Sequence, residues 1–143
     1  MSGLLHRILY RLLPLEGYLR VVSSLFFLWH RLGLGRRSEA LEYVYHLPRL
    51  VRAGDVCIDI GANLGYYART LARLAGPEGR VYAVEPVAPV RKVLSRNLRR
   101  CVNTEIIPYA LGGEDRTVVL ANDSARETGY LGTGRNFVKE SGG

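Results

Sequence analysis

The sequence predicts an α/β fold built on a parallel sheet, and three observations support this prediction. An apolar run, Val56–Ile60, leads directly into a glycine-rich turn, Gly61–Gly65. A helical pattern follows the turn, and a second apolar run, Arg80–Glu85, then ends in a carboxylate. Strands that alternate with helices over short connections form parallel sheets with right-handed crossovers. The chain has 143 residues, which is room for one such domain.

Three helices are expected around these strands, over residues 39–52, 66–75 and 86–98. Ser38 fits the N-cap position of the first helix, and Pro48 predicts a kink or a restart within it near His46. Gly76-Pro77 is a typical stop signal for the second helix. Pro86 and Pro89 fall in the opening turn of the third helix, where proline is tolerated.

Two further strands are expected, over 105–109 and, more briefly, over 116–120. From residue 121 onward the sequence is rich in Asn, Ser, Gly, Thr and charge, so no further helix or buried strand is expected. The expected organisation has three parts: a basic, apolar helical arm (1–38), a half that contains the glycine-rich turn and the alternating strands and helices (39–120), and a polar tail or insertion that is poorly ordered (121–143).

The N-terminal arm carries most of the positive charge. The net charge is +7, and residues 1–53 hold 8 Arg against 3 Glu. The apolar run Val21–Trp29 is too short to cross a bilayer, which takes about 20 residues. No small-residue cleavage site follows that run, which argues against a signal peptide. Two interpretations stay open: peripheral contact of residues 1–35 with an anionic membrane, or two helices that pack on the core or on a partner.

Other classes of function find little support in the composition. Arginine makes up 18 of the 20 basic residues, but the aromatic side chains lie in apolar runs instead of among the charges, so no nucleic acid is expected as a partner. The three histidines are scattered, so no metal site is expected. Cys57 and Cys101 are expected to be free thiols in a reducing, cytoplasmic location.

The glycine-rich turn has the chemistry of a ligand cradle. Gly61 fits a position with a positive φ angle or a close approach of ligand to backbone, and Asn63 tolerates left-handed geometry. Gly65 allows the following helix to pack tightly. The dinucleotide fingerprint G-x-G-x-x-G is missing, because Tyr66 stands where its last glycine would be, and this argues against a nicotinamide dehydrogenase.

Two carboxylates flank this turn in the expected fold. Asp59 ends an otherwise apolar strand, where a charge is costly unless it is paired or faces a ligand. Glu85 ends the next strand, which is where an α/β sheet commonly holds ribose hydroxyls. Water exposure of Glu85 and loop N–H contacts of Asp59 are the alternatives. Tyr66 is a minor candidate for contact with the ligand.

Three blocks of sequence together resemble the FkbM family of S-adenosylmethionine-dependent methyltransferases. They are Asp59–Tyr67, Gly76–Pro86 and Tyr109–Gly112, in that order and at similar spacing. The resemblance covers roughly residues 39–120. It implies a class I methyltransferase (Rossmann-like) parallel sheet, S-adenosyl-L-methionine as the cofactor, and O-methylation of a hydroxyl on a sugar, glycolipid or polyketide-like acceptor.

The resemblance also implies roles for individual residues. Asp59, Gly61, Asn63 and Gly65 would line the methionine and ribose side of the cofactor, Glu85 would hold the ribose diol, and Ala110 and Leu111 would lie near the adenine. Ala62, Tyr66 and Pro86 fall within the same blocks. No catalytic residue is assigned.

The resemblance stops before the C-terminus. The family continues with a fourth strand that carries a Lys-Ile-Asp-x-Glu-Gly-like block and with further strands, and residues 113–143 match none of these. The chain therefore resembles the cofactor half of a methyltransferase, and the expected sheet is partial. The alternative is a non-catalytic remnant or interaction module, which could form a homo-oligomer through its exposed sheet edge.

Overall fold

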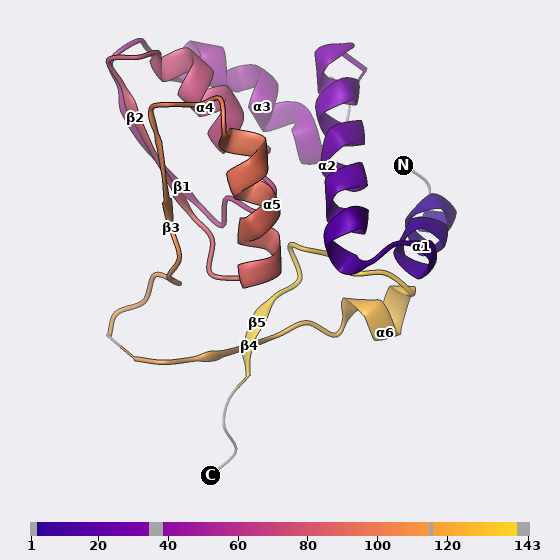
Figure 1. Cartoon of the computed structure of the whole chain (residues 1–143). Coiled ribbons are helices and arrows are strands. Elements are labelled where there is room, and N and C mark those ends of the chain that lie inside the picture. Colours follow the sequence, from indigo (N-terminus) through magenta and orange to yellow (C-terminus); the bar gives the residue numbers. More distant parts are fainter. Residues whose placement is uncertain (1–2, 35–38, 115, 140–143) are drawn as a thin grey trace.

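The computed structural model describes residues 3–34, 39–114 and 116–139, and it confirms the predicted fold class. Three parallel strands, β1 (Val56–Ile60), β2 (Arg80–Val84) and β3 (Thr104–Ile107), form a sheet in chain order (Figure 1). Val56 pairs with Arg80, and Val81 pairs with Thr104. The three predicted strands of this sheet are each present to within two residues at either end, and the fourth predicted strand (116–120) begins three residues later than expected, as β4 (Val119–Ala121).

Three helices, α3 (Glu39–Leu50), α4 (Ala68–Ala75) and α5 (Ala88–Leu98), lie on one side of this sheet (Figure 1). All three were expected. The predicted restart near Pro48 is wrong, because α3 runs through this proline as one helix. The expected N-cap, Ser38, lies outside the described residues. The helix α4 begins two residues later than predicted, because the turn that contains Gly65 continues through Tyr67.

A compact apolar core joins α4 and α5 to the sheet. Its buried members come from the glycine-rich turn, α4, β2 and α5: Ala62, Ala68, Leu71, Ala72, Ala75, Val81, Ala83, Leu94 and Leu98. The side chain of Asn103 is buried at one end of this core, and its Nδ2 donates to the carbonyl oxygens of Ala72 (2.9 Å) and Gly76 (2.7 Å). The last carbonyls of α4 are thereby satisfied by the residue that precedes β3.

Gly65 is the tightest point between the turn and α5. Its φ is +88°, and a Cβ atom there would lie 3.0 Å from Cδ1 of Leu94. Substitution Gly65→Ala is expected to destabilise the fold by about 1–3 kcal/mol, through backbone strain and displaced packing. Gly113→Ala is the control, because that position has ordinary φ and open space. Urea unfolding of both variants measures the difference, and an equal midpoint would contradict the packing role of Gly65.

The N-terminal arm forms two helices, α1 (Gly3–Leu12) and α2 (Leu15–Arg31). Tyr18 and Leu19 of α2 are fully buried in a second apolar cluster with Val90 and Val93 of α5. For α2, the structure therefore shows the interpretation in which the arm packs on the core. None of the described helices is long and apolar enough to cross a membrane. Contact of residues 1–35 with a membrane surface stays a prediction.

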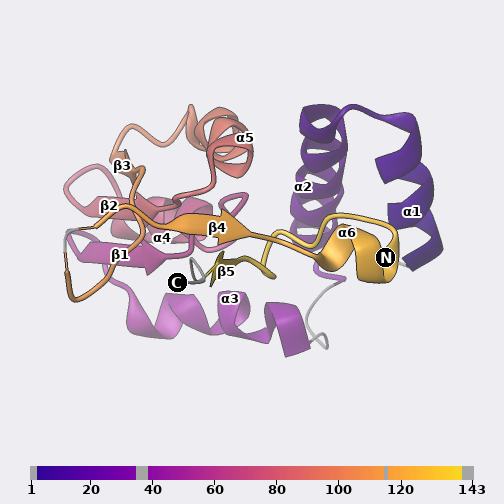
Figure 2. The ribbon, with the colours of Figure 1, turned by 90° about the horizontal axis from the view of Figure 1, so that it is seen from below.

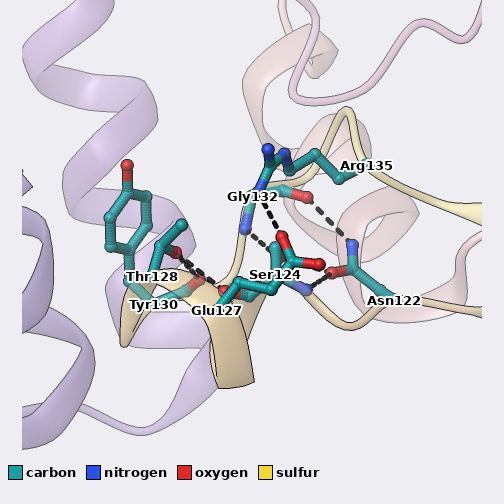
Figure 3. Close-up of polar contacts among 7 residues, drawn as sticks. All are labelled: Asn122, Ser124, Glu127, Thr128, Tyr130, Gly132 and Arg135. Carbon is teal, nitrogen blue, oxygen red and sulfur yellow. Dashed lines mark hydrogen bonds and ion pairs between the residues drawn. The ribbon is translucent and has the colours of Figure 1, made fainter.

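The segment after residue 121 contains structure that the sequence analysis did not predict. A short helix, α6 (Ser124–Thr128), lies between β4 (Val119–Ala121) and β5 (Phe137–Lys139), which pair as an antiparallel hairpin. The expectation of no further helix is therefore wrong. Polar side chains hold the turn: the Ser124 N–H donates to Oδ1 of Asn122 (3.0 Å), and the Gly132 N–H donates to Oγ of Ser124 (2.8 Å) (Figure 3).

This segment is also tied to the N-terminal helices (Figure 2). Nε of Arg7 donates to the Thr128 carbonyl (2.8 Å), and the Tyr18 hydroxyl donates to the Leu131 carbonyl (3.2 Å). The ring of His6 stacks on Tyr130 with centroids 4.8 Å apart. Residues 128–131 therefore contact the helices α1 and α2, while the predicted division of the chain at residues 38 and 120 stays a prediction.

The other face of the sheet is open. On β1 the side chains of Val56, Ile58 and Ile60 are 69%, 63% and 69% exposed, and they alternate with the half-buried Cys57 and Asp59. Among the described residues β1 has one neighbouring strand, β2. Parallel sheets are normally covered on both faces, so this apolar face is a surface at which a further layer could pack.

Candidate cofactor site

The glycine-rich turn lies where β1 and β2 end. The N–H groups of Gly61 and Ala62 both donate to the Val84 carbonyl, at 3.0 and 2.9 Å, and this holds the turn across the carboxyl ends of the two strands. Gly61 has φ +77° and Asn63 has φ +52°, so the expected left-handed geometry is confirmed at both residues. No atom lies within 4 Å of where a Cβ of Gly61 would stand. The turn therefore presents open backbone at a sheet edge where α/β proteins bind ligands.

Glu85 joins the end of β2 to this turn. Its side chain is buried, Oε2 accepts the Asn63 N–H (2.9 Å), and Oε1 accepts the Val87 N–H (2.9 Å). The alternative of a simply water-exposed carboxylate is therefore wrong. A carboxylate has about four lone-pair directions, so each oxygen can still accept one further hydrogen bond. Two such acceptors on one group match the two hydroxyls of a ribose diol.

Two further acceptors in the same place are buried without a hydrogen-bond partner among the described residues. They are Oδ2 of Asp59 and Oδ1 of Asn63. Burial raises the pKa of Asp59 to about 6, a hydrogen bond from the Ala68 backbone opposes this effect, and the nearby charge of Glu85 adds to it. Buried acceptors without partners are costly. A ligand that brings a cationic amine or N–H donors would satisfy them and lower the pKa of Asp59.

Arg91, which the sequence analysis did not single out, belongs to the same region. Nη1 of Arg91 donates to the carbonyl oxygens of Glu85 (3.1 Å) and Pro86 (2.8 Å), and the side chain is half-buried. This contact fixes the backbone that follows β2. Its signal in the sequence is weak, because an arginine in the first turns of a helix is common whether or not it bonds to the preceding loop.

The remaining candidate residues are less closely grouped. The ring of Tyr66 packs against Phe26 of α2, with centroids 4.1 Å apart, and burial raises the pKa of its hydroxyl. Ala110 and Leu111 are exposed and follow the end of β3. The Glu85 N–H donates to the Ile107 carbonyl (3.0 Å), so the end of β3 lies beside Glu85. The proposed contacts of Tyr66, Ala110 and Leu111 with a ligand stay predictions.

The described ranges contain no candidate metal site, and burial disfavours the thiolate form of both cysteines. No group of three His, Cys, Asp or Glu side chains there could hold a metal ion. Both cysteines are free thiols, and burial raises the pKa of Cys57 and of Cys101. A raised thiol pKa leaves less of the reactive thiolate at neutral pH.

Parts of several methyltransferases are similar to this chain. The chain is 28% identical over 95 residues to a protein-L-isoaspartate O-methyltransferase of Ignicoccus hospitalis, which covers 65% of this chain and 40% of that relative. It is 32% identical over 80 residues to a ribosomal RNA large subunit methyltransferase E of Anaeromyxobacter dehalogenans, covering 55% of this chain and 30% of the relative. These relatives are methyltransferases by name.

Among solved structures, an S-adenosylmethionine-dependent O-methyltransferase of Thermotoga maritima aligns with 26% identity and a TM-score of 0.45, over 48% of this chain and 28% of that one. No family model matches the chain. The chain spans well under half the length of the curated relatives that are named above. The finer resemblance to the FkbM family stays a prediction.

Proposed function

We propose that this chain forms the cofactor-binding half of an S-adenosylmethionine-dependent methyltransferase of the FkbM type. The observation that carries the proposal is the group of acceptors at the ends of β1 and β2: the Glu85 carboxylate, Oδ2 of Asp59 and Oδ1 of Asn63. S-adenosylmethionine presents a cationic amine and a ribose diol, and the donors of both groups suit these acceptors. The methyltransferase relatives support the same cofactor.

The residues at this site fit the cofactor in distinct ways. Glu85 would accept hydrogen bonds from the ribose hydroxyls, and ionised Asp59 would pair with the amine directly or through water. Gly61 leaves room for the ligand to approach the backbone. The bound cofactor supplies a methyl group on a sulfonium, and the chain's own residues bind and orient that group for in-line transfer. None of the described residues is assigned as a general base.

The acceptor proposed first is a hydroxyl on a sugar, glycolipid or polyketide-like molecule, because the three sequence blocks resemble a family with such acceptors. A protein carboxyl or an RNA is the second candidate. It is favoured by the names of the two curated relatives, which are an isoaspartate O-methyltransferase and a ribosomal RNA methyltransferase. Transfer of a radiolabelled methyl group to each class of acceptor distinguishes the two candidates.

Calorimetric titration of the 143-residue chain with S-adenosylhomocysteine tests the cofactor assignment. We expect one molecule to bind per chain. Absence of binding by a folded chain would contradict the proposal and would favour the alternative of a non-catalytic remnant or interaction module. Adenosine is the matched comparison ligand, because it has the ribose diol but lacks the amine that Asp59 would bind.

A non-catalytic interaction module could associate with a second copy of itself through the open apolar face of the sheet. Ile58 lies at the middle of β1, between Val56 and Ile60 on that face, and is 63% exposed. We expect the parent chain to show a concentration-dependent mass in sedimentation, and Ile58→Lys to shift it toward monomer, because a charge on an apolar contact face costs several kcal/mol. Val102→Lys, at a position 88% exposed in a turn, is the control. A monomeric parent at all concentrations would contradict this prediction.

A further inference from the structure

A basic groove lies at the opposite end of the sheet from the glycine-rich turn. Its volume is about 840 Å³, and it is lined by the end of α2, by α4 and by residues 100–103. These residues lie where the strands begin: Asn103 precedes β3, and the Gly54 N–H, just before β1, donates to the Ala75 carbonyl of α4 (2.8 Å). In Figure 1 the end of α2 and the beginnings of the strands both lie at the top of the molecule. The groove is therefore separate from the candidate cofactor site.

The charge of this groove has one sign. No aspartate or glutamate lines it. The arginines that line it are four, all exposed: Arg31, Arg69, Arg73 and Arg100. None of the four makes an ion pair with a described residue, and Arg69 instead lies over the Phe27 ring, 4.6 Å from its centroid. Burial and the charges of Arg73 and Arg69 lower the pKa of His30, which also lines the groove. The groove thus concentrates positive charge with which no carboxylate in the described part of the chain pairs.

Exposed apolar side chains border the groove at the end of α2. Leu28, which lines it, is 52% exposed, Trp29 is 43% exposed, and Leu32 and Leu34 are each 62% exposed. Leu28 and Leu32 are one helical turn apart, and Trp29 is three residues from Leu32, so the three lie on one side of α2. Leucines beside tryptophan and arginine are typical of helices that lie in the interface of a membrane.

We propose that this groove binds the phosphate headgroups of anionic phospholipids, while the exposed end of α2 rests in the boundary between headgroups and acyl chains. The planar, bidentate donors of arginine suit phosphate oxygens. The apolar rim decides between lipid and RNA, because a nucleic acid would leave the exposed leucines in water. The proposal rests on residues outside the candidate cofactor site and does not depend on methyl transfer.

Trp29 is the sole tryptophan of the chain, so it reports on this rim directly. Titration of the full chain with vesicles of phosphatidylglycerol and phosphatidylcholine is expected to shift the Trp29 emission to shorter wavelength, and vesicles of phosphatidylcholine alone are expected to leave it unchanged. The double variant Arg69→Gln/Arg73→Gln is expected to bind the anionic vesicles at least about tenfold more weakly, because each basic side chain near such a surface contributes appreciably.

Two matched variants control for net charge and for folding. Arg116→Gln/Arg126→Gln removes the same charge from exposed positions outside the groove and is expected to bind like the parent. Arg100→Gln removes a groove arginine that has no ring contact among the described residues, and it is expected to weaken binding while circular dichroism stays unchanged. Point variants are needed, because deletion of α2 would remove Tyr18 and Leu19 from the core.

Each other result overturns the proposal. If Arg69→Gln/Arg73→Gln and Arg116→Gln/Arg126→Gln lose the same amount of vesicle affinity, the chain binds through its general positive charge and not through the groove. Vesicle binding without a Trp29 shift would place the contact elsewhere. If inorganic phosphate alone raises the pKa of His30 in an NMR titration and the vesicles do not bind, the ligand is a soluble phosphate. If a single-stranded oligoribonucleotide binds more tightly than the vesicles and depends on Arg69 and Arg73, the groove is an RNA site.

Discussion

Replacement of Glu85 by glutamine is expected to weaken binding of S-adenosylhomocysteine by about 100-fold. Each carboxylate oxygen already accepts a loop N–H, from Asn63 and from Val87, and has one acceptor direction left for a ribose hydroxyl. Hydrogen bonds to a charged group contribute about 1.5–3 kcal/mol each and neutral ones about 0.5–1.5 kcal/mol. Weakening two bonds by about 1.4 kcal/mol each corresponds to about two orders of magnitude in affinity. Calorimetric titration measures the change.

Glu85→Gln is also expected to lower stability. The amide has one oxygen, so its NH₂ group would face a loop N–H, and one buried donor would be left without an acceptor, at a cost of about 1–3 kcal/mol. Circular dichroism and thermal unfolding separate this effect from the loss of binding. Glu105→Gln is the matched control, because Glu105 is half-exposed and pairs with Arg80. Parent-like affinity in folded Glu85→Gln would refute the ribose assignment.

Replacement of Asp59 by asparagine is expected to raise the stability of the ligand-free chain at neutral pH and to weaken cofactor binding. Burial raises the pKa of Asp59 from 3.8 to about 6 in the folded state. The folded state therefore binds this proton more tightly than the unfolded state does. The corresponding stability is present below pH 3.8 and is lost as the pH rises to about 6. At pH 7 the ionised group costs up to about 3 kcal/mol.

Asparagine never ionises, so the variant escapes this cost, and we expect its unfolding midpoint in urea at pH 7 to exceed that of the parent. The same charge would pair with the amine of the cofactor. Binding of S-adenosylhomocysteine to the parent should therefore fall below pH 6, as Asp59 becomes protonated, and should lose this pH dependence in Asp59→Asn. Binding that is independent of pH in the parent would show that ionised Asp59 does not hold the amine.

Much of the sheet could be predicted because local sequence determines it. The turn Gly61–Gly65 needs left-handed geometry at Gly61 and Asn63, and these residue types supply it. The third helix was predicted over residues 86–98, and its apolar residues Val90, Val93, Leu94 and Leu98, which recur at helical spacing, are all buried in α5. Gly65 was predicted to allow tight packing of the helix that follows it, whereas the side chain nearest to its would-be Cβ atom, Leu94, belongs to α5.

The features that the sequence analysis missed depend on contacts between distant segments. Helix α6 has five residues and no apolar period. The turn around it is held by backbone N–H groups that donate to the side-chain oxygens of Asn122 and Ser124. Arg91 could not be distinguished from its solvated neighbours, because its bonds reach back to the loop after β2. The basic groove combines residues from α2, from α4 and from the segment 100–103 before β3, which no local pattern connects.

The pairing of strands in chain order has a consequence for how this domain folds. Each pairing, Val56 with Arg80 and Val81 with Thr104, closes over a single helix. Contacts between segments that are near in sequence cost little loop entropy and form early. The three-stranded unit can therefore grow by one strand and one helix at a time, in the order in which a ribosome delivers them. The bonds from α1 and α2 to residues 128 and 131 span almost the whole chain and are expected to form last.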